Sequence, residues 1–184
     1  MDDLDSEGQQ VDVRGADRLT DPIVDTWADV GLDSNGRWSW PADEAQFSVD
    51  VGSGVDDAGL DVLAAVLDAT PRESATLAVH VEHGRRNDLQ GGRRDALERL
   101  AANPDVTALT DDTAGTAPAT AETLEAVFRL YGTDLRRATM LDEGELAIVE
   151  YLDGQVEFSL PAERIDEVRS PLPERVRDRL TRRS

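Results

Sequence analysis

The chain has 184 residues, of which 39% are hydrophobic, so it is long enough for one domain with a sizeable core. It carries 39 acidic residues against 19 basic ones, a formal net charge of −20, and every basic residue is an arginine. Because cysteine is absent, disulfides, thiolate nucleophiles and zinc–thiolate sites are excluded. Because lysine is absent, Schiff-base chemistry and a phosphate loop ending in Gly-Lys-Ser/Thr are excluded as well.

The acidity points to the surroundings of the protein rather than to a partner. The composition resembles that of proteins from salt-loving microbes, whose carboxylates hydrate the surface and whose lysine is scarce. Charges of one sign repel one another, but at 1 M salt the screening length falls to about 3 Å. We therefore predict a halophilic protein; the alternative is an ordinary acidic protein from a GC-rich genome.

The amino-terminal residues lack the features of a targeting segment. Met1–Asp5 has neither a basic region nor a hydrophobic stretch, and no apolar run approaches the roughly 18 residues of a membrane span. We expect a cytoplasmic protein without a membrane segment. Residues 1–18 are polar and acidic and predict a mobile tail, whereas residues 19–184 predict a single α+β domain.

A short amphipathic helix is predicted after the tail. Asp21-Pro22 supplies an N-cap followed by proline at the first helical position, and Ile23, Trp27 and Val30 recur at helical spacing before Gly31. Beyond it, Trp38 and Trp40 alternate with polar residues as in a strand. We interpret these two indoles as core, or as the lid of a small core, rather than as a binding platform.

Residues Ala45–Val51 alternate between apolar and polar and predict a half-buried strand, which a helix over residues 56–69 follows. The intervening Asp50-Val51-Gly52-Ser53-Gly54 resembles the first motif of methyltransferases that use S-adenosylmethionine, which implies a nucleotide-like cofactor at Gly52 and Gly54. Asp56 stands where that motif has a third glycine, and it places negative charge at the helix start. The favoured interpretation is a glycine turn followed by a helix that Asp56 caps, with no cofactor.

The next predicted strand, Ala75–Glu82, places Leu77, Val79 and Val81 inward and His80 and Glu82 outward. His83 follows at the turn, so a metal-dependent enzyme site could use these groups, although the sequence nominates no third ligand. We favour surface histidines near a strand end and name no metal. The candidate ligand-binding residues of this region are His80, Glu82, His83, Arg85 and Arg86.

A helix over residues 88–102 carries Arg93 and Arg94 on its polar side. Together with Arg85, Arg86 and the arginines from Arg175 to Arg183, they would form the surface of a nucleic-acid-binding protein. Acidic residues are interleaved with them, and a helix face of mixed charge is usually solvated. High salt also removes the counterion-release term that drives phosphate binding, so we do not expect a nucleic-acid partner.

The middle of the chain predicts a short strand at residues 106–109, a loop of small residues at 110–120, a helix at 120–131 and a strand at 135–141. Thr120 caps this helix and Gly132 stops it. The following loop at Asp142–Gly144 has two alternatives. A four-residue loop places Ala138 and Met140 on the core face, whereas a three-residue loop pairs Arg136 with Glu150.

A β-hairpin over Glu145–Leu160 has a register that can be derived. Asp153-Gly154 fits a type I′ turn, so Leu152 faces Gln155 and pairing runs backwards from there. The pairs of one face form a core face: Tyr151 with Val156, Val149 with Phe158, and Ala147 with Leu160. The pairs of the other face are partly wet: Glu150 with Glu157, and Ile148 with Ser159.

The carboxyl-terminal part predicts a short helical turn near Ile165 and Val168, and then an arginine-rich helix at 173–183. Leu172, Val176 and Leu180 form a narrow apolar stripe that could dock on the domain or on a second copy.

The half-polar strands predict an α+β two-layer sandwich, with helices on one face of a mixed or mainly antiparallel sheet; the alternative is a three-layer α/β fold. The parallel or antiparallel order of the first strands stays open. No convergent catalytic set emerges, which favours an interaction or small-ligand-binding protein without a cofactor over an enzyme. A homodimer or protein partner would use the open sheet face or the C-terminal helix.

Overall fold

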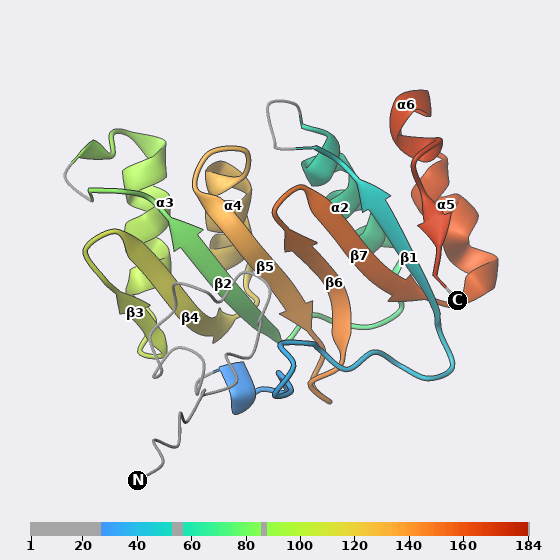
Figure 1. The fold of residues 1–184 in the computed structure, drawn as a ribbon, viewed down its shortest axis with the longest axis horizontal. Helices are drawn as coiled ribbons and strands as arrows, with labels where there is room; N and C mark the ends of the chain where they lie inside the picture. Colours follow the sequence, from blue (N-terminus) through green and yellow to red (C-terminus); the bar gives the residue numbers. More distant parts are fainter. Residues whose placement is uncertain (1–26, 53–56, 86–87, 184) are drawn as a thin grey trace, which may run out of the picture.

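The computed structural model describes residues 27–52, 57–85 and 88–183, and these carry one eight-stranded antiparallel sheet (Figure 1). Its spatial order is β3-β4-β2-β5-β6-β7-β1-β8. The strands are β1 Ala45–Asp50, β2 Thr76–Glu82, β3 Val106–Ala108, β4 Asp112–Pro118, β5 Leu135–Leu141, β6 Ala147–Leu152, β7 Gln155–Leu160 and β8 Thr181–Arg182.

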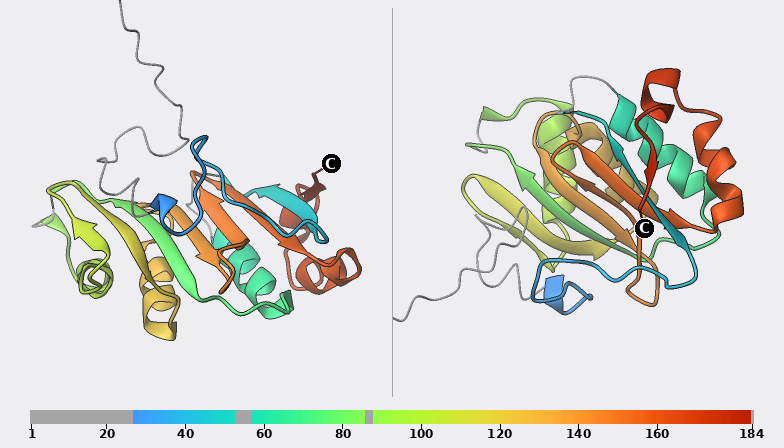
Figure 2. Two further views of the ribbon diagram at one scale, coloured as in Figure 1. Left: turned by 90° about the horizontal axis from the view of Figure 1, so that it is seen from below. Right: turned by 45° about the vertical axis from the view of Figure 1, so that its right-hand side comes forward.

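Apart from a short helical turn at Trp27, the helices lie on one side of this sheet, as Figure 2 shows from below. The predicted two-layer α+β arrangement is therefore confirmed, and the three-layer alternative is wrong. The helices are α2 Ala58–Ala69, α3 Gly92–Ala101, α4 Ala121–Leu130, α5 Ile165–Arg169 and α6 Glu174–Arg177, with a 3₁₀ turn, η2, at Ala162–Arg164. Within the described part of the chain, no helix is long and apolar enough to cross a membrane.

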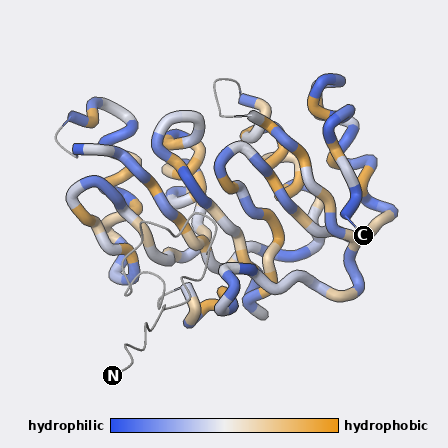
Figure 3. Tube along the Cα trace, in the orientation of Figure 1, coloured by the Kyte–Doolittle hydropathy of each residue, from blue (hydrophilic) through white to orange (hydrophobic). Residues whose placement is uncertain are grey.

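Alternation along the strands builds the core between the sheet and the helices. Leu77, Val79 and Val81 all point into this core, as predicted for β2, and Phe47 stacks on Phe158 with ring centroids 5.4 Å apart. The tube in Figure 3 changes between hydrophobic and hydrophilic along the strands, which is the period-two pattern of a sheet with two different faces.

The β6–β7 hairpin has the predicted register over its turn-proximal half. Asp153 and Gly154 both have positive φ, 43° and 89°, as a type I′ turn requires. Four cross-strand pairs are as expected: Leu152 with Gln155, Tyr151 with Val156, Glu150 with Glu157 and Val149 with Phe158.

The prediction that Ala147 shares the core face with Val149 is wrong. The β5–β6 register shifts between Met140 and Leu141, so Ile148 enters the helix-side core while Ala147 turns to the opposite face. A bulge of this kind moves every side chain beyond it by one position. Ala138 and Met140 lie in the helix-side core, as the four-residue loop alternative required.

Residues 110–120, expected to be a loop, instead contain strand β4. Its small side chains have low strand propensity, but they leave room for close backbone approach. A Cβ atom on Gly115 would collide with the backbone of Asp105 and lie 2.7 Å from the Val106 Cα atom. The Trp27 indole also donates a hydrogen bond of 3.0 Å to the Gly115 carbonyl.

The helix predicted at 173–183 is much shorter than expected. Only Glu174–Arg177 is α-helical, and Thr181–Arg182 pairs with β1 as the edge strand β8. Leu172, Val176 and Leu180 are buried in the helix-side core, so the apolar stripe docks on its own sheet and helices. The helix ends at Arg177. Leu180 still packs into the core, and the backbone that follows it pairs with β1.

The face of the sheet away from the helices is only partly open. Trp27, Leu32 and Trp38 pack against Ala78, Ala114, Leu141 and Ala147 and form a second, smaller core. The expectation that this face is left entirely to water or a partner is therefore wrong. No strand forms at Trp38 and Trp40, but the interpretation of these indoles as the lid of a small core is confirmed.

Other boundaries differ by a few residues or fall outside the described ranges. Helix α3 begins at Gly92 rather than at residue 88, and α2 begins at Ala58 with Asp57 at its N-cap. Thr120 caps α4 and forms a capping box with Thr123, as expected for a helix that starts there. The predicted tail at 1–18, Asp56, and all but the end of the predicted helix near Trp27 lie outside the described residues.

Gly115→Ala should destabilise the protein by about 2–4 kcal/mol, because a side chain meets immobile backbone and Gly115 has a φ of +149°. Gly92→Ala is the matched control, since its new Cβ would meet only the end of the Arg129 side chain. Urea unfolding at fixed KCl measures both. Equal stability of the two variants would contradict the close approach of β4 to the Asp105–Val106 backbone.

Candidate functional site

The open face of the central strands carries charged groups in register with one another. Glu150 on β6 lies opposite Thr139 on β5 and Glu157 on β7, and Arg137 on β5 lies opposite His80 on β2. These residues point to the open face because their neighbours along each strand fill the helix-side core. Polar side chains from four adjacent strands, β2, β5, β6 and β7, therefore lie on the same face near the middle of the sheet.

A buried ion pair stands at the centre of this group. The Arg137 Nε donates to Glu150 Oε1 at 2.6 Å, and only 2% of Arg137 is exposed. The same Oε1 accepts a hydrogen bond of 3.2 Å from the Trp38 indole and one of 3.3 Å from the Thr139 hydroxyl. Arg137 also donates to the Gly36 carbonyl at 3.2 Å, so it joins the sheet to the segment at 35–40.

Two indole rings cover the guanidinium group. The Arg137 Cζ lies 5.3 Å from the Trp27 ring centroid and 5.5 Å from that of Trp38, within cation–π distance of both. The two rings are tilted by 50° with centroids 6.3 Å apart. Arginine suits this position because its planar, weakly hydrated group can stack and donate hydrogen bonds at once.

Burial raises the pKa of Glu150 above its ordinary value of 4.5, against the opposing effect of Arg137. The negative charge of Glu157 acts in the same direction as burial. Because the pKa of Glu150 is higher in the folded than in the unfolded state, protonation of this carboxyl favours folding. This contribution to the free energy of unfolding is fully present at pH values below the unfolded pKa. That contribution is lost as the pH rises through the folded pKa.

A hollow of about 520 Å³ opens beside the ion pair. Residues of β1, β5, β6 and β7 line it together with the segment at 35–40 and Arg183 near the C-terminus. Its lining is mainly charged and amide groups, and Trp38, Trp40 and Leu152 are its apolar members. The lining residues are Asn35, Gly36, Arg37, Trp38, Trp40, Gln46, Arg137, Glu150, Leu152, Glu157 and Arg183.

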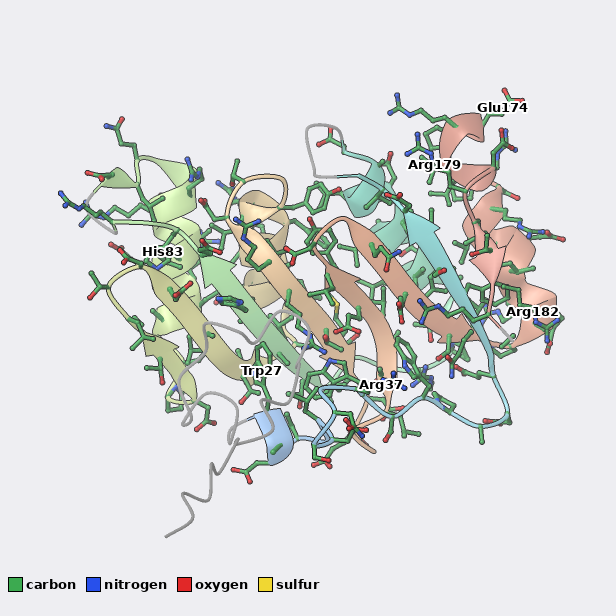
Figure 4. The ribbon with its side chains drawn as sticks, in the orientation of Figure 1. Trp27, Arg37, His83, Glu174, Arg179 and Arg182 are labelled. Carbon is green, nitrogen blue, oxygen red and sulfur yellow. The ribbon has the colours of Figure 1, made fainter. Side chains whose placement is uncertain are left out.

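A second hollow of about 550 Å³ shares Gln46 and Arg183 with the first. It is lined further by Glu44, Ala45 and Arg182. Between the two, Arg183 pairs with Glu157 at 2.7 Å, and its backbone N–H donates to the Gln46 carbonyl at 2.8 Å. Strand β8 thus places arginine side chains at the far end of the depression, and Figure 4 shows Arg182 there, with Arg37 nearer the centre of the sheet.

The histidine cluster predicted from the sequence lies elsewhere, and Figure 4 shows His83 far from Arg37 and Arg182. The expectation that both histidines are on the surface is wrong, since His80 is 3% exposed and His83 is 7% exposed. The His80 Nε2 is 3.1 Å from Asp112 Oδ1, whereas its buried Nδ1 has no hydrogen-bond partner among the described residues. They are buried because β4, expected to be a loop, pairs with β2 and brings Asp112 and Thr113 beside them.

The proposed metal and cofactor positions do not converge. His83 bonds to the Gly84 carbonyl and the Thr113 hydroxyl, and Glu82 pairs with Arg136 at 3.1 Å. In residues 27–52, 57–85 and 88–183, no group of three His, Cys, Asp or Glu side chains is placed to hold a metal ion. Gly52 has a φ of +73°, as a turn glycine does, while Gly54 lies outside the described residues.

Three of the arginines considered for nucleic-acid binding, Arg93, Arg94 and Arg183, pair with neighbouring acids. Arg93 makes a bidentate pair with Asp134 at 2.6 and 2.8 Å, and Arg94 pairs with Glu98 at 3.0 Å. Arg85 is exposed, and Arg86 lies outside the described residues. A phosphate backbone would have to compete with these internal pairs.

Arg137→Met should destabilise the protein by about 3–5 kcal/mol at pH 7, because it leaves the Glu150 carboxylate buried without its cation. The loss should shrink as the pH falls below the raised pKa of Glu150, where the carboxyl takes up a proton. Urea unfolding at a series of pH values from 7 downwards measures this difference.

The double variant Arg137→Met, Glu150→Gln should recover part of the stability at pH 7. Arg169→Met, at an exposed position on α5, serves as the control and should change little. A destabilisation by Arg137→Met that is independent of pH and of residue 150 would mean that packing, and not charge, explains the effect.

Comparison with protein-family models, with curated proteins and with solved structures gives no match for this chain, so the site is interpreted from its own residues.

Proposed function

We propose that the protein is a non-enzymatic binding module that takes a small polar ligand in the hollow bounded by the segment at 35–40 and Arg183. The observation that carries this proposal is the convergence of side chains on one hollow of about 520 Å³, from β1, β5, β6, β7, the segment at 35–40 and the C-terminus. A volume of this size suits a small molecule. The buried ion pair beneath it gives the hollow a rigid floor.

The chemistry of the lining favours binding over catalysis. Glu150 accepts three hydrogen bonds at one oxygen, and Arg137 is held between two indoles. Both groups are thereby fixed in place, which suits recognition. A general base or nucleophile would need a reactive atom presented to the substrate.

A small ligand also fits the described surface better than a second copy of the chain does. The apolar stripe of Leu172, Val176 and Leu180, the feature suggested for dimerisation, is buried within the molecule. The exposed part of the open face is instead polar and concave. This supports a ligand that is surrounded by protein groups, as opposed to a flat apolar interface.

Gln46→Trp should abolish ligand binding, because Gln46 lines both hollows and a larger side chain would fill the space between them. Gln155→Trp is the matched control, since Gln155 is exposed on the hairpin outside the hollow. A metabolite screen by thermal shift in KCl provides the measurement. A ligand at 100 times its Kd contributes about 2.7 kcal/mol, or roughly 5–10 °C for a chain of this size.

A ligand that shifts the melting temperature of the parent and of Gln155→Trp, but not that of Gln46→Trp, supports the hollow as the site. A ligand that stabilises all three proteins equally binds elsewhere and contradicts the proposal. Both tryptophan variants need cooperative unfolding of their own for the comparison to hold.

We propose further that the acidity of the chain is an adaptation to high salt in the cytoplasm. The supporting observation is the net charge of −20 without any lysine. Self-repulsion between surface carboxylates weakens the folded state at low ionic strength, and salt screens it.

The melting temperature should therefore rise by at least about 5 °C between 0.1 and 2 M KCl. Neutralising exposed acids that make no ion pair among the described residues should raise stability at low salt and flatten the dependence. Suitable substitutions are Asp29→Asn, Asp43→Asn, Asp68→Asn, Glu73→Gln and Glu143→Gln, combined in one variant. An unchanged salt dependence in this variant would contradict the screening explanation.

A further inference from the structure

The charge in the hollow has the opposite sign from that of the chain as a whole. Arg37, Arg137 and Arg183 line it together with Glu150 and Glu157, so three guanidinium groups face two carboxylates. The formal balance is one positive charge, in a chain whose net charge is −20. The rest of the chain therefore repels anions, whereas this hollow has room for one negative charge.

Of the three cations, Arg37 is the one placed to meet a ligand. Arg137 is paired with Glu150 at 2.6 Å and Arg183 with Glu157 at 2.7 Å. Arg37 is exposed and lines the hollow, and no ion pair joins its guanidinium to an acidic group among the described residues. The pKa of the neighbouring Asp33 is nevertheless lowered, by the backbone hydrogen bond from Arg37 and also by the charge of its side chain. The Arg37 backbone N–H is fixed by a hydrogen bond of 2.8 Å to Asp33 Oδ1, which anchors the turn that presents the side chain.

Apolar side chains line the same hollow as this cation. Trp40 and Leu152 are half-buried and line the hollow, whereas Trp38 is almost completely buried and turns its indole N–H to Glu150. A partly exposed indole offers a flat face on which a ring can stack. The side-chain amides of Asn35 and Gln46 add neutral hydrogen-bonding groups at two sides.

We infer that the ligand of this hollow is a monoanion that carries a carboxylate on a flat ring, with the carboxylate at Arg37 and the ring against Trp40. A carboxylate matches the geometry of a guanidinium group, which can donate to both of its oxygens. A single negative charge neutralises the balance of the hollow, whereas a dianion would leave an excess in a molecule that is already strongly acidic. This inference rests on the proposed function, because it names the class of ligand for the same site.

The test uses the full chain labelled with ¹⁵N, in KCl at about 2 M, and follows the indole N–H signals of Trp38 and Trp40. Four probes are titrated: benzoate, benzylamine, cyclohexanecarboxylate and phenyl phosphate. Benzoate should shift the indole signals saturably, with a Kd of about 1 mM as expected for a fragment of this size. Benzylamine should produce no saturable shift, and the other two anions should bind at least about fivefold more weakly.

Arg37→Gln should weaken benzoate binding about tenfold, whereas Arg169→Gln on α5 removes the same charge far from the hollow and should leave it unchanged. Trp40→Leu should weaken the binding of benzoate more than it weakens the binding of cyclohexanecarboxylate. Unaltered benzoate binding by Arg37→Gln, or equal binding of benzylamine, overturns the anion assignment. If cyclohexanecarboxylate binds as tightly as benzoate, the assignment of a flat ring is wrong. If phenyl phosphate binds more tightly than benzoate, the assignment of a single negative charge is wrong.

The outcomes also separate this inference from the function on which it rests. If benzylamine saturates the indole shifts in the parent chain and Gln46→Trp abolishes them, the hollow is a binding site and only the assigned ligand class is wrong. If no probe gives a saturable shift, the assigned ligand class is wrong, and the metabolite screen with Gln46→Trp decides separately whether the hollow is a binding site.

Discussion

The Arg137–Glu150 ion pair is the interaction on which the open face of the sheet depends. A buried charge has a large desolvation penalty unless it is paired and hydrogen-bonded, and here Glu150 Oε1 accepts hydrogen bonds from Arg137, Trp38 and Thr139. The pair fixes the segment at 35–40 through Trp38 and Gly36, and the two indoles exclude water from the guanidinium group. Together with the hydrogen bond of 2.8 Å from the Ala147 N–H to the Ser39 carbonyl, it holds this segment against β5 and β6.

The same pair explains why the open face has a hollow and not a flat surface. Trp27 and Trp38 cover only β4, β2, β5 and the start of β6, so the smaller core ends near Glu150. Beyond it, Glu157 on β7 and Gln46 on β1 line the hollow, and so does Arg183, which directly follows the edge strand β8. The concavity therefore lies between the covered half of the sheet and its C-terminal edge, beside a rigid, dehydrated ion pair.

Much of the helix-side architecture was predictable from local patterns. Period-two alternation identified β1, β2, β6 and β7, the Asp153-Gly154 turn identified the hairpin register, and Thr120 marked the start of α4. The patterns failed where a tertiary contact overrode local preference. The small residues of β4 have weak strand propensity, yet Gly115 is needed for close approach to the Asp105–Val106 backbone.

The candidate site was less accessible to sequence-based reasoning. Glu150 and Glu157 were correctly placed opposite each other on the polar face, and the two tryptophans were correctly interpreted as a lid. The ion-pair partner of Glu150 is Arg137 on β5. The sequence did not predict this pair, because the length of the loop after β5, and hence the register of β5 against β6, stayed undecided. The bulge that sends Ala147 outward and Ile148 inward depends on contacts of the Ala147 backbone, whose N–H donates to the Ser39 carbonyl and whose carbonyl accepts from Arg72.

The sequence by itself determined that the sheet has one apolar and one polar face, because alternation along a strand is a local property. It also determined the excess of negative charge and the absence of cysteine and lysine chemistry. Only the tertiary structure decided which polar residues meet, since Arg37, Arg137, Glu150 and Arg183 come from distant parts of the chain. Their convergence depends on strand order, on one bulge and on the docking of the segment at 35–40, and these follow from packing that no single stretch of sequence contains.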